Sequence, residues 1–188
     1  MSHTPNHTRF SGAQRLLHWS MAAGIVAMLF IGVGMLSTVA PSYVPLVATH
    51  KTLGVALFAL VLVRLILRLV LGAPPLPASL PPLMRLGAVL SHWALYGLMI
   101  VMPLLGWAML SAADYPIVLF GNFRLPPIVP QSDALHTLLW AAHRWLAFAF
   151  FALILLHVAA ALFHALVRHD GVFEAMSPLP ASKATPER

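Results

Sequence analysis

The chain alternates between long apolar runs and short polar segments. A helix needs about 20 apolar residues to cross the hydrocarbon core of a bilayer. Four runs are long enough, and they set the fold class as an all-α membrane protein with a bundle of four transmembrane helices. We expect the spans at about residues 15–36, 50–71, 85–110 and 141–167.

Polar and proline-rich segments separate the four runs. Residues 37–49 are rich in Pro, Ser and Thr, and Ala73–Pro82 contains a Pro-Pro pair, which cannot continue a helix. Ala112–Asp133 holds four prolines and a Gly-Asn pair, so we expect a long irregular connection. We assign residues 1–178 to one transmembrane domain and residues 179–188 to a disordered cytoplasmic tail.

The composition excludes several classes of protein. The chain has 188 residues, of which 60% are hydrophobic and 9% are charged, which leaves no room for a separate soluble domain. It has no cysteine, which excludes disulfides, cysteine-ligated iron–sulfur clusters, thiolate-bound haem and covalently attached haem.

The net charge of +6 reflects topology. The basic residues flank the apolar spans instead of forming one patch, which excludes nucleic acid as a partner. Lys and Arg collect on the cytoplasmic side of membrane proteins, and their distribution favours cytoplasmic N- and C-termini. The residues expected inside are Arg9, Arg15, Arg64, Arg68, Arg85, Arg168, Lys183 and Arg188, and those expected outside are Lys51, Arg124 and Arg144.

Two histidines in the last span carry the strongest functional signal. His143 and His157 are fourteen residues apart, which in a helix returns to within about 40° of the same face, roughly 21 Å further along. Polar residues inside a membrane are costly and are usually functional. Two imidazoles on one face, one near each side of the bilayer, could each hold an iron.

Other helices provide partners at matching depths. His50 begins the second span on the outer side, as His143 begins the fourth, so these two form an outer pair. The inner partner of His157 is either His18 or His92, and depth alone does not choose between them. Imidazole is a strong axial ligand for a b-type haem. The pattern therefore predicts two haems stacked across the membrane.

Several segments together resemble the bacterial cytochrome b561 family of di-haem membrane cytochromes, over about residues 9–178. The segments are Arg15–Trp19, His50–Gly54, Val63–Arg68, Ser91-His92, Met102–Gly106, and His143 with His157–His164. The resemblance implies a protein of the bacterial inner membrane that oxidises superoxide on the outer side and reduces ubiquinone. It also implies that His18 and His157 hold the inner haem and that His50 and His143 hold the outer one.

Further residues fit such a role. His164 and His92 are left free of iron and are our candidates for exchanging protons with the quinone. Arg64, fourteen residues after His50, points towards the bundle interior, and we expect it and Arg68 to contact haem propionates. Lys51, Arg124 and Arg144 are placed to raise the local concentration of the superoxide anion on the outer side.

Two other functions remain possible from the sequence. The chain could be an electron-transfer subunit that serves a periplasmic dehydrogenase or a small cytochrome. It could also be a membrane protein without haem, with its histidines along a proton or metal path, but the histidine spacing disfavours this reading.

Overall fold

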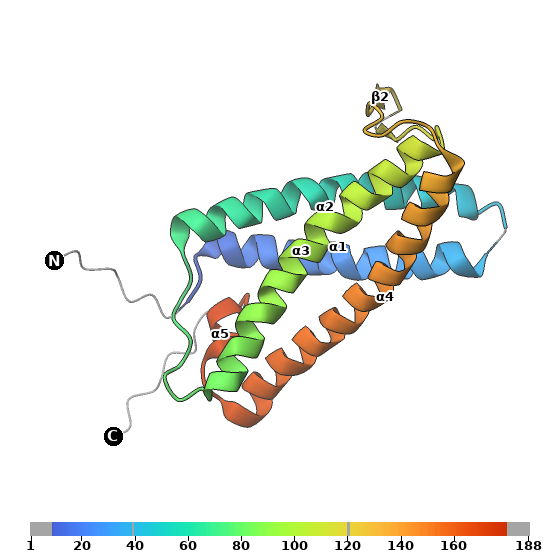
Figure 1. Cartoon of the computed structure of the whole chain (residues 1–188). Coiled ribbons are helices and arrows are strands. Elements are labelled where there is room, and N and C mark those ends of the chain that lie inside the picture. Colours follow the sequence, from blue (N-terminus) through green and yellow to red (C-terminus); the bar gives the residue numbers. More distant parts are fainter. Residues whose placement is uncertain (1–8, 39, 120, 180–188) are drawn as a thin grey trace, which may run out of the picture.

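The computed structural model describes residues 9–38, 40–119 and 121–179, and it is dominated by four long helices (Figure 1). All four are long and apolar enough to cross a membrane, so the predicted four-helix membrane fold is confirmed. The elements in chain order are α1 (Gly12–Ser37), α2 (Tyr43–Leu71), α3 (Pro82–Ala112), β1 (Val118–Leu119), β2 (Phe123–Arg124), α4 (Asp133–Phe163), the π-helical turn η1 (His164–Arg168) and α5 (Val172–Met176).

Every long helix begins earlier than its apolar run predicts. The largest differences are in α2, which begins at Tyr43 instead of residue 50, and in α4, which begins at Asp133 instead of residue 141. Hydropathy detects only the part of a helix that lies in lipid, whereas local signals set its ends. Ser132 caps α4 by accepting a hydrogen bond from the backbone N–H of Leu135 at 3.3 Å. Pro45 lies in the first turn of α2, where a missing N–H costs nothing.

The helices pack as two pairs. α1 lies along α2 and α3 along α4, and the pairs meet mainly where α2 contacts α3. In Figure 1, α3 and α4 cross the α1–α2 pair obliquely. We call the end where α1 begins and α4 finishes the terminal end, and the opposite end, which carries β1 and β2, the hairpin end.

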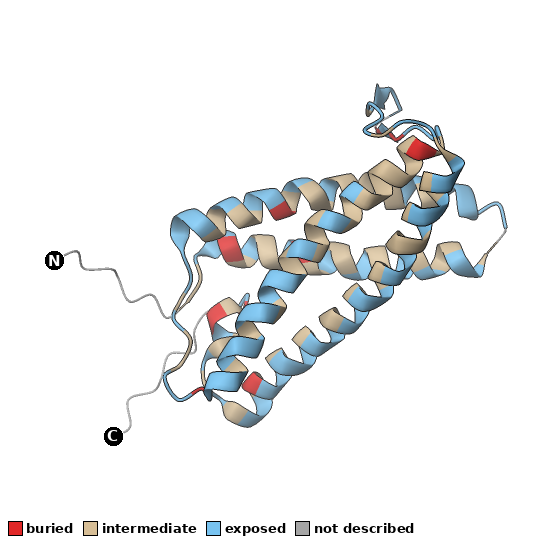
Figure 2. Cartoon of the chain, viewed as in Figure 1, coloured by how far each residue is buried: buried red, intermediate tan, exposed pale blue. Residues whose placement is uncertain are grey.

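Large apolar side chains cover the outside of the bundle. Phe30, Val70 and Leu83 are 75%, 73% and 80% exposed, and Figure 2 shows how few positions on the four helices are fully buried. Such a surface is compatible with lipid and not with water. Polar groups of a functional site are therefore expected among the side chains that lie between the two helix pairs.

The connections contain more structure than the sequence predicts. In the segment 112–133, β1 and β2 form a short antiparallel hairpin in which Val118 is opposite Arg124. After the last span, α5 folds back against the start of α1, where the Trp19 indole N–H donates to the carbonyl of Met176 at 2.9 Å. The predicted tail falls mostly on residues 180–188, which lie outside the described residues.

Candidate functional site

Two histidine clusters lie between the helix pairs. At the hairpin end, His50 of α2 faces His143 of α4, with ring centres 6.2 Å apart and ring planes at 66°. These two side chains are 93 positions apart in sequence. They come together because the first half of α4 passes close to the first half of α2. The structure thus brings together the pair that the sequence predicts on the outer side.

The cluster at the terminal end contains three histidines. His157 of α4 lies 6.3 Å from His18 of α1, between ring centres, and 5.5 Å from His92 of α3. The Nδ1 of His92 donates to the carbonyl of Ala88, one turn earlier on its own helix. Both candidates for the inner partner of His157 are therefore neighbours of its ring.

A glycine on α3 faces one histidine of the pair at the hairpin end. A Cβ atom on Gly106 would lie 3.4 Å from Cε1 of His143 and 3.7 Å from its Nδ1. By contrast, Gly24 on α1 packs against Leu57, as small residues do where two membrane helices approach closely. A Cβ at Gly106 would touch the His143 ring at ordinary contact distance, so a side chain larger than alanine there would press on the ring, whereas Gly24 serves the packing of the bundle.

Several buried nitrogen atoms in this interior have no hydrogen-bond partner among the described residues. They are Nδ1 of His50, Nδ1 of His143, Nη1 of Arg68 and Nε of Arg15. A buried polar group without a partner is costly, and a redox role or a bound group is among the reasons why a protein keeps one. Here the unpartnered atoms are imidazole nitrogens at one end and guanidinium donors at the other.

The two arginines predicted to face the interior lie at the terminal end. Arg64 Nη1 donates to the carbonyl of Gln14 at 3.3 Å, and its guanidinium lies 6.0 Å from the centre of the Tyr96 ring. The guanidinium of Arg68 lies 5.5 Å from the centre of the Phe10 ring. Arg15 is also at this end, and its Nε is buried without a partner among the described residues.

His164 has a partner that sequence analysis missed. Its Nδ1 lies 2.8 and 3.0 Å from the carboxylate oxygens of Asp170, and both side chains are buried. The chain has only five Asp and Glu residues, and Asp170 follows His164 by six residues at the end of a span. That rarity and proximity are the sequence signal that could have indicated the contact. His164 thus lies outside the terminal-end cluster.

The three basic residues predicted on the outer side all lie at the hairpin end, in different settings. Lys51 Nζ donates to the carbonyl of Pro116 at 3.4 Å and so ties α2 to the connection after α3. Arg124 is exposed on β2. The guanidinium of Arg144 lies 4.7 and 5.5 Å from the ring centres of Trp140 and Trp145, an arrangement that anchors a helix at a membrane surface.

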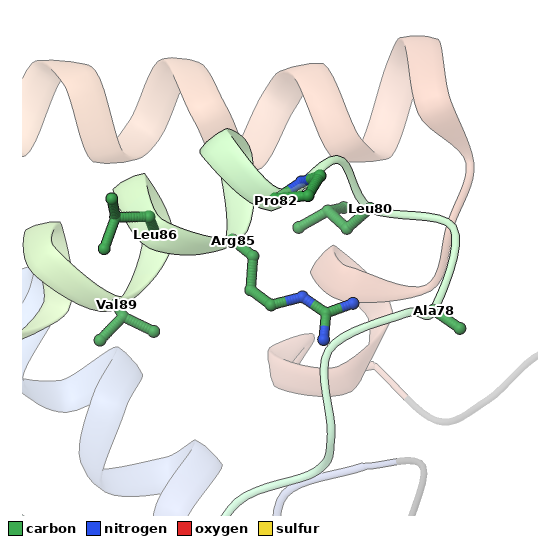
Figure 3. A pocket seen from close by; sticks show the side chains of 6 residues that line it. All are labelled: Ala78, Leu80, Pro82, Arg85, Leu86 and Val89. Carbon is green, nitrogen blue, oxygen red and sulfur yellow. The ribbon is translucent and has the colours of Figure 1, made fainter.

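An open apolar groove lies at the terminal end, beside the start of α3 (Figure 3). Its volume is about 660 Å³, and Leu80, Leu86 and Val89 contribute apolar lining. Arg85 is its charged residue, and the guanidinium donates to the carbonyl of Pro77 at 3.3 Å. Next to Leu80, the carbonyl of Ser79 accepts a weak hydrogen bond from Arg168, at 3.5 Å.

Comparison with known proteins identifies the family. The profile of the prokaryotic cytochrome b561 family matches residues 9–178. The chain belongs to this family. It is 30% identical to cytochrome b561 homolog 2 of Escherichia coli (strain K12), over 94% of this chain and 95% of that protein. It is 28% identical to a protein named probable superoxide oxidase CybB from Yersinia pestis, over 92% and 97% of the two chains.

Family membership makes the chain a multi-pass membrane protein of electron transfer and implies b-type haem. The residues present fit that group. Buried, unpartnered imidazole nitrogens are suited to bind iron, and the unpartnered guanidinium nitrogens of Arg68 and Arg15 are suited to bind the carboxylates of a haem. The absence of cysteine agrees with non-covalent binding through histidine.

The role of Gly106 can be tested by filling its space. Gly106→Leu should push the His143 ring out of place and lower the haem content of the purified protein, as measured by its pyridine haemochrome. Gly32→Leu is the matched control, because no atom lies within 4 Å of a Cβ at that position. Equal haem content in the two variants would show that the contact between Gly106 and His143 is unimportant for the site.

Proposed function

We propose that the protein binds two b-type haems, each held between two histidines. His50 and His143 would hold one at the hairpin end, and His18 and His157 the other at the terminal end. Metal–imidazole bonds of about 2 Å place the centres of two rings on opposite sides of one metal roughly 6 Å apart. The separations of 6.2 and 6.3 Å between the ring centres support both pairs.

His18 is the better partner for His157 in this proposal. The His18 ring lies 6.3 Å from that of His157, close to the roughly 6 Å expected for two rings that share one iron, whereas the His92 ring lies at 5.5 Å, which is too close. We assign His92 to the surroundings of the haem, where it is a candidate for exchanging protons. Arg64 and Arg68 lie at the same end, and the unpartnered Nη1 of Arg68 is available to a haem propionate.

We place the protein in the bacterial inner membrane with the terminal end in the cytoplasm. The distribution of Lys and Arg supports this orientation, because basic residues are concentrated on the cytoplasmic side of membrane proteins. Arg9, Arg15 and Arg168 are at the terminal end, with the short helix α5. The hairpin end would then face the periplasm.

The reaction that this arrangement supports best is electron transfer from superoxide to ubiquinone. Two superoxide anions lose one electron each and become oxygen, and one quinone takes up the two electrons and two protons to become a quinol. Bound between these histidine pairs, haem would supply the one-electron chemistry that links the two reactions. The observation that carries the proposal is the two histidine clusters that α4 connects through His143 and His157, which are fourteen residues and so roughly 21 Å apart along that helix.

Residues at the two ends of the bundle would attract superoxide at one end and bind and protonate the quinone at the other. Lys51, Arg124 and Arg144 place positive charge at the hairpin end and would raise the local concentration of superoxide. The name of the Yersinia pestis relative, probable superoxide oxidase, supports superoxide as the donor. At the terminal end, the apolar groove beside α3 has a volume typical of ligand sites, which is about 300–1,000 Å³. It would admit a quinone, and His164 would supply a proton.

The hairpin favours a second candidate function. Tyr115 and Phe123 are 63% and 60% exposed at the end where electrons would enter. An exposed apolar hairpin is a suitable contact for a protein donor. The chain would then be an electron-transfer subunit of a periplasmic dehydrogenase or a partner of a small cytochrome.

Turnover by the isolated protein distinguishes the two functions. Purified, haem-replete protein should reduce a soluble ubiquinone when superoxide is generated enzymatically, and added superoxide dismutase should abolish the reaction. His164→Ala should keep the haem content and slow quinone reduction by about 100-fold, the scale of a lost proton donor. If superoxide reduces neither the haems nor the quinone, the donor is a protein partner instead.

A further inference from the structure

The last span ends in an unusual turn. The α-helix α4 stops at Phe163, and residues 164–168 continue as a π-helical turn that closes with a hydrogen bond from the N–H of His169 to the carbonyl of His164, at 2.9 Å. Single π-turns are rare and occur often at functional sites. His169 then adopts a left-handed conformation (φ 49°), and Gly171 follows with φ 81°. This sharp reversal brings the Asp170 carboxylate back to the Nδ1 of His164.

The Asp170 carboxylate is buried and fully engaged. It accepts hydrogen bonds from His164 Nδ1, from Arg168 Nε at 2.9 Å and from the backbone N–H of Val172 at 3.3 Å. Its side chain is 8% exposed, and that of His164 is 11% exposed. A side chain with this many fixed partners does not rotate freely, so it can hold the ring of His164 in one orientation.

Asp170 stays ionised in this setting. Burial raises the pKa of its carboxyl, but the hydrogen bonds from Arg168, His164 and the Val172 N–H act in the opposite direction and hold the pKa below its ordinary value. An ionised carboxylate only accepts hydrogen bonds. The proton of the neutral His164 ring must therefore lie on Nδ1, which leaves Nε2 as the nitrogen that exchanges protons.

We propose that Asp170 is a positioning residue that fixes the orientation and tautomer of His164, so that Nε2 passes a proton to a quinone at the terminal end. This inference rests on the proposed quinone reduction. When both electrons have arrived, one of the two protons goes from Nε2 of protonated His164 to a quinone carbonyl oxygen. The second proton comes from water, and His164 regains its own proton from the cytoplasmic side.

The same network reaches the apolar groove. Arg168, which binds Asp170 through Nε, also donates through its Nη2 to the carbonyl of Ser79, between two residues that line the groove. Two elements therefore meet at the network: the turn η1, which carries His164, and the loop before α3, which borders the groove. This continuity supports a role for the histidine–aspartate pair beside the groove proposed for the quinone.

Asp170→Asn tests the proposal. An asparagine keeps the shape of the side chain, but its amide can donate to Nδ1 and so favour the wrong tautomer. We expect the kcat of quinone reduction to fall about tenfold or more, with KM for the quinone and the haem spectrum nearly unchanged. Glu174→Gln, which removes an exposed carboxylate four residues later, is the matched control and should retain full turnover. Asp170→Glu restores a carboxylate and should recover part of the rate.

A spectroscopic readout separates positioning from a structural role. In the haem-reduced protein, the ¹⁵N shifts of the His164 ring, assigned by their loss in His164→Ala, should show a proton on Nδ1 and change in Asp170→Asn. Unchanged shifts together with an unchanged kcat in Asp170→Asn would overturn the proposal. If His164→Ala itself leaves quinone reduction unchanged, the proposed quinone site is wrong, whatever the ¹⁵N shifts show.

Discussion

Replacing His157 with alanine is expected to remove the haem at the terminal end and to leave the other one in place. His157 is the residue that both possible partners share, since His18 and His92 each lie beside its ring. No other described histidine in this cluster comes from α4, so a neighbouring side chain on the same helix cannot replace it. The pyridine haemochrome should fall from two haems per chain to one, and quinone reduction should be lost.

Two companion variants identify the partner of His157. His18→Ala should lose the same haem, whereas His92→Ala should keep two haems per chain with an α band close to that of the unmodified protein. The opposite outcome, haem loss in His92→Ala and retention in His18→Ala, would show that α3 and not α1 provides the second ligand. Retention of two haems in His157→Ala would contradict the assignment of this cluster altogether.

Replacing His143 with alanine is expected to have the second large effect, at the hairpin end. His143 lies 6.2 Å from His50, between ring centres, and its Nδ1 has no partner among the described residues. The variant should hold one haem per chain. Dithionite should still reduce that haem, but superoxide should no longer drive quinone reduction, because the proposed path from the hairpin end is broken.

His136→Ala is the matched control for this variant. His136 lies seven residues earlier on α4, and its Nδ1 contacts the carbonyl of Met109 at 3.0 Å instead of another histidine. It should retain both haems and the superoxide-driven reaction. Equal haem loss in both variants would indicate a general destabilisation of α4 and not the loss of an iron ligand.

The sequence predicts the bundle well because a membrane leaves few alternatives. A run of about 20 apolar residues must be helical in lipid, where every backbone group needs an internal partner. The starts of the helices were less predictable, since Tyr43 and Asp133 lie outside the apolar runs. The first residue of a helix is determined by capping residues such as Ser132 before α4, which a hydropathy profile does not detect.

The histidine positions were predictable for a related reason. A fourteen-residue spacing fixes both the face and the depth of His143 and His157, and depth then selects His50. Depth could not rank His18 and His92, because that choice depends on how the α1–α2 pair crosses α4, a tertiary feature. The structure places both rings near His157.

Asp170 shows what spacing arguments miss. Its contact with His164 depends on the π-turn and on the positive φ angles of His169 and Gly171, which no hydrophobic period encodes. Arg144 illustrates the same limit, because its charge was visible in the sequence but its stacking on Trp140 and Trp145 was not. Local backbone geometry and side-chain packing decide both cases.

A count of haem in the purified protein tests the central claim most directly. The measurement is a dithionite-reduced minus oxidised spectrum, together with a pyridine haemochrome assay normalised to protein. We predict two b-type haems per chain with a sharp α band, as expected for iron between two imidazoles. One haem per chain would mean that one histidine pair is assigned wrongly, and protein that takes up no haem would contradict the account.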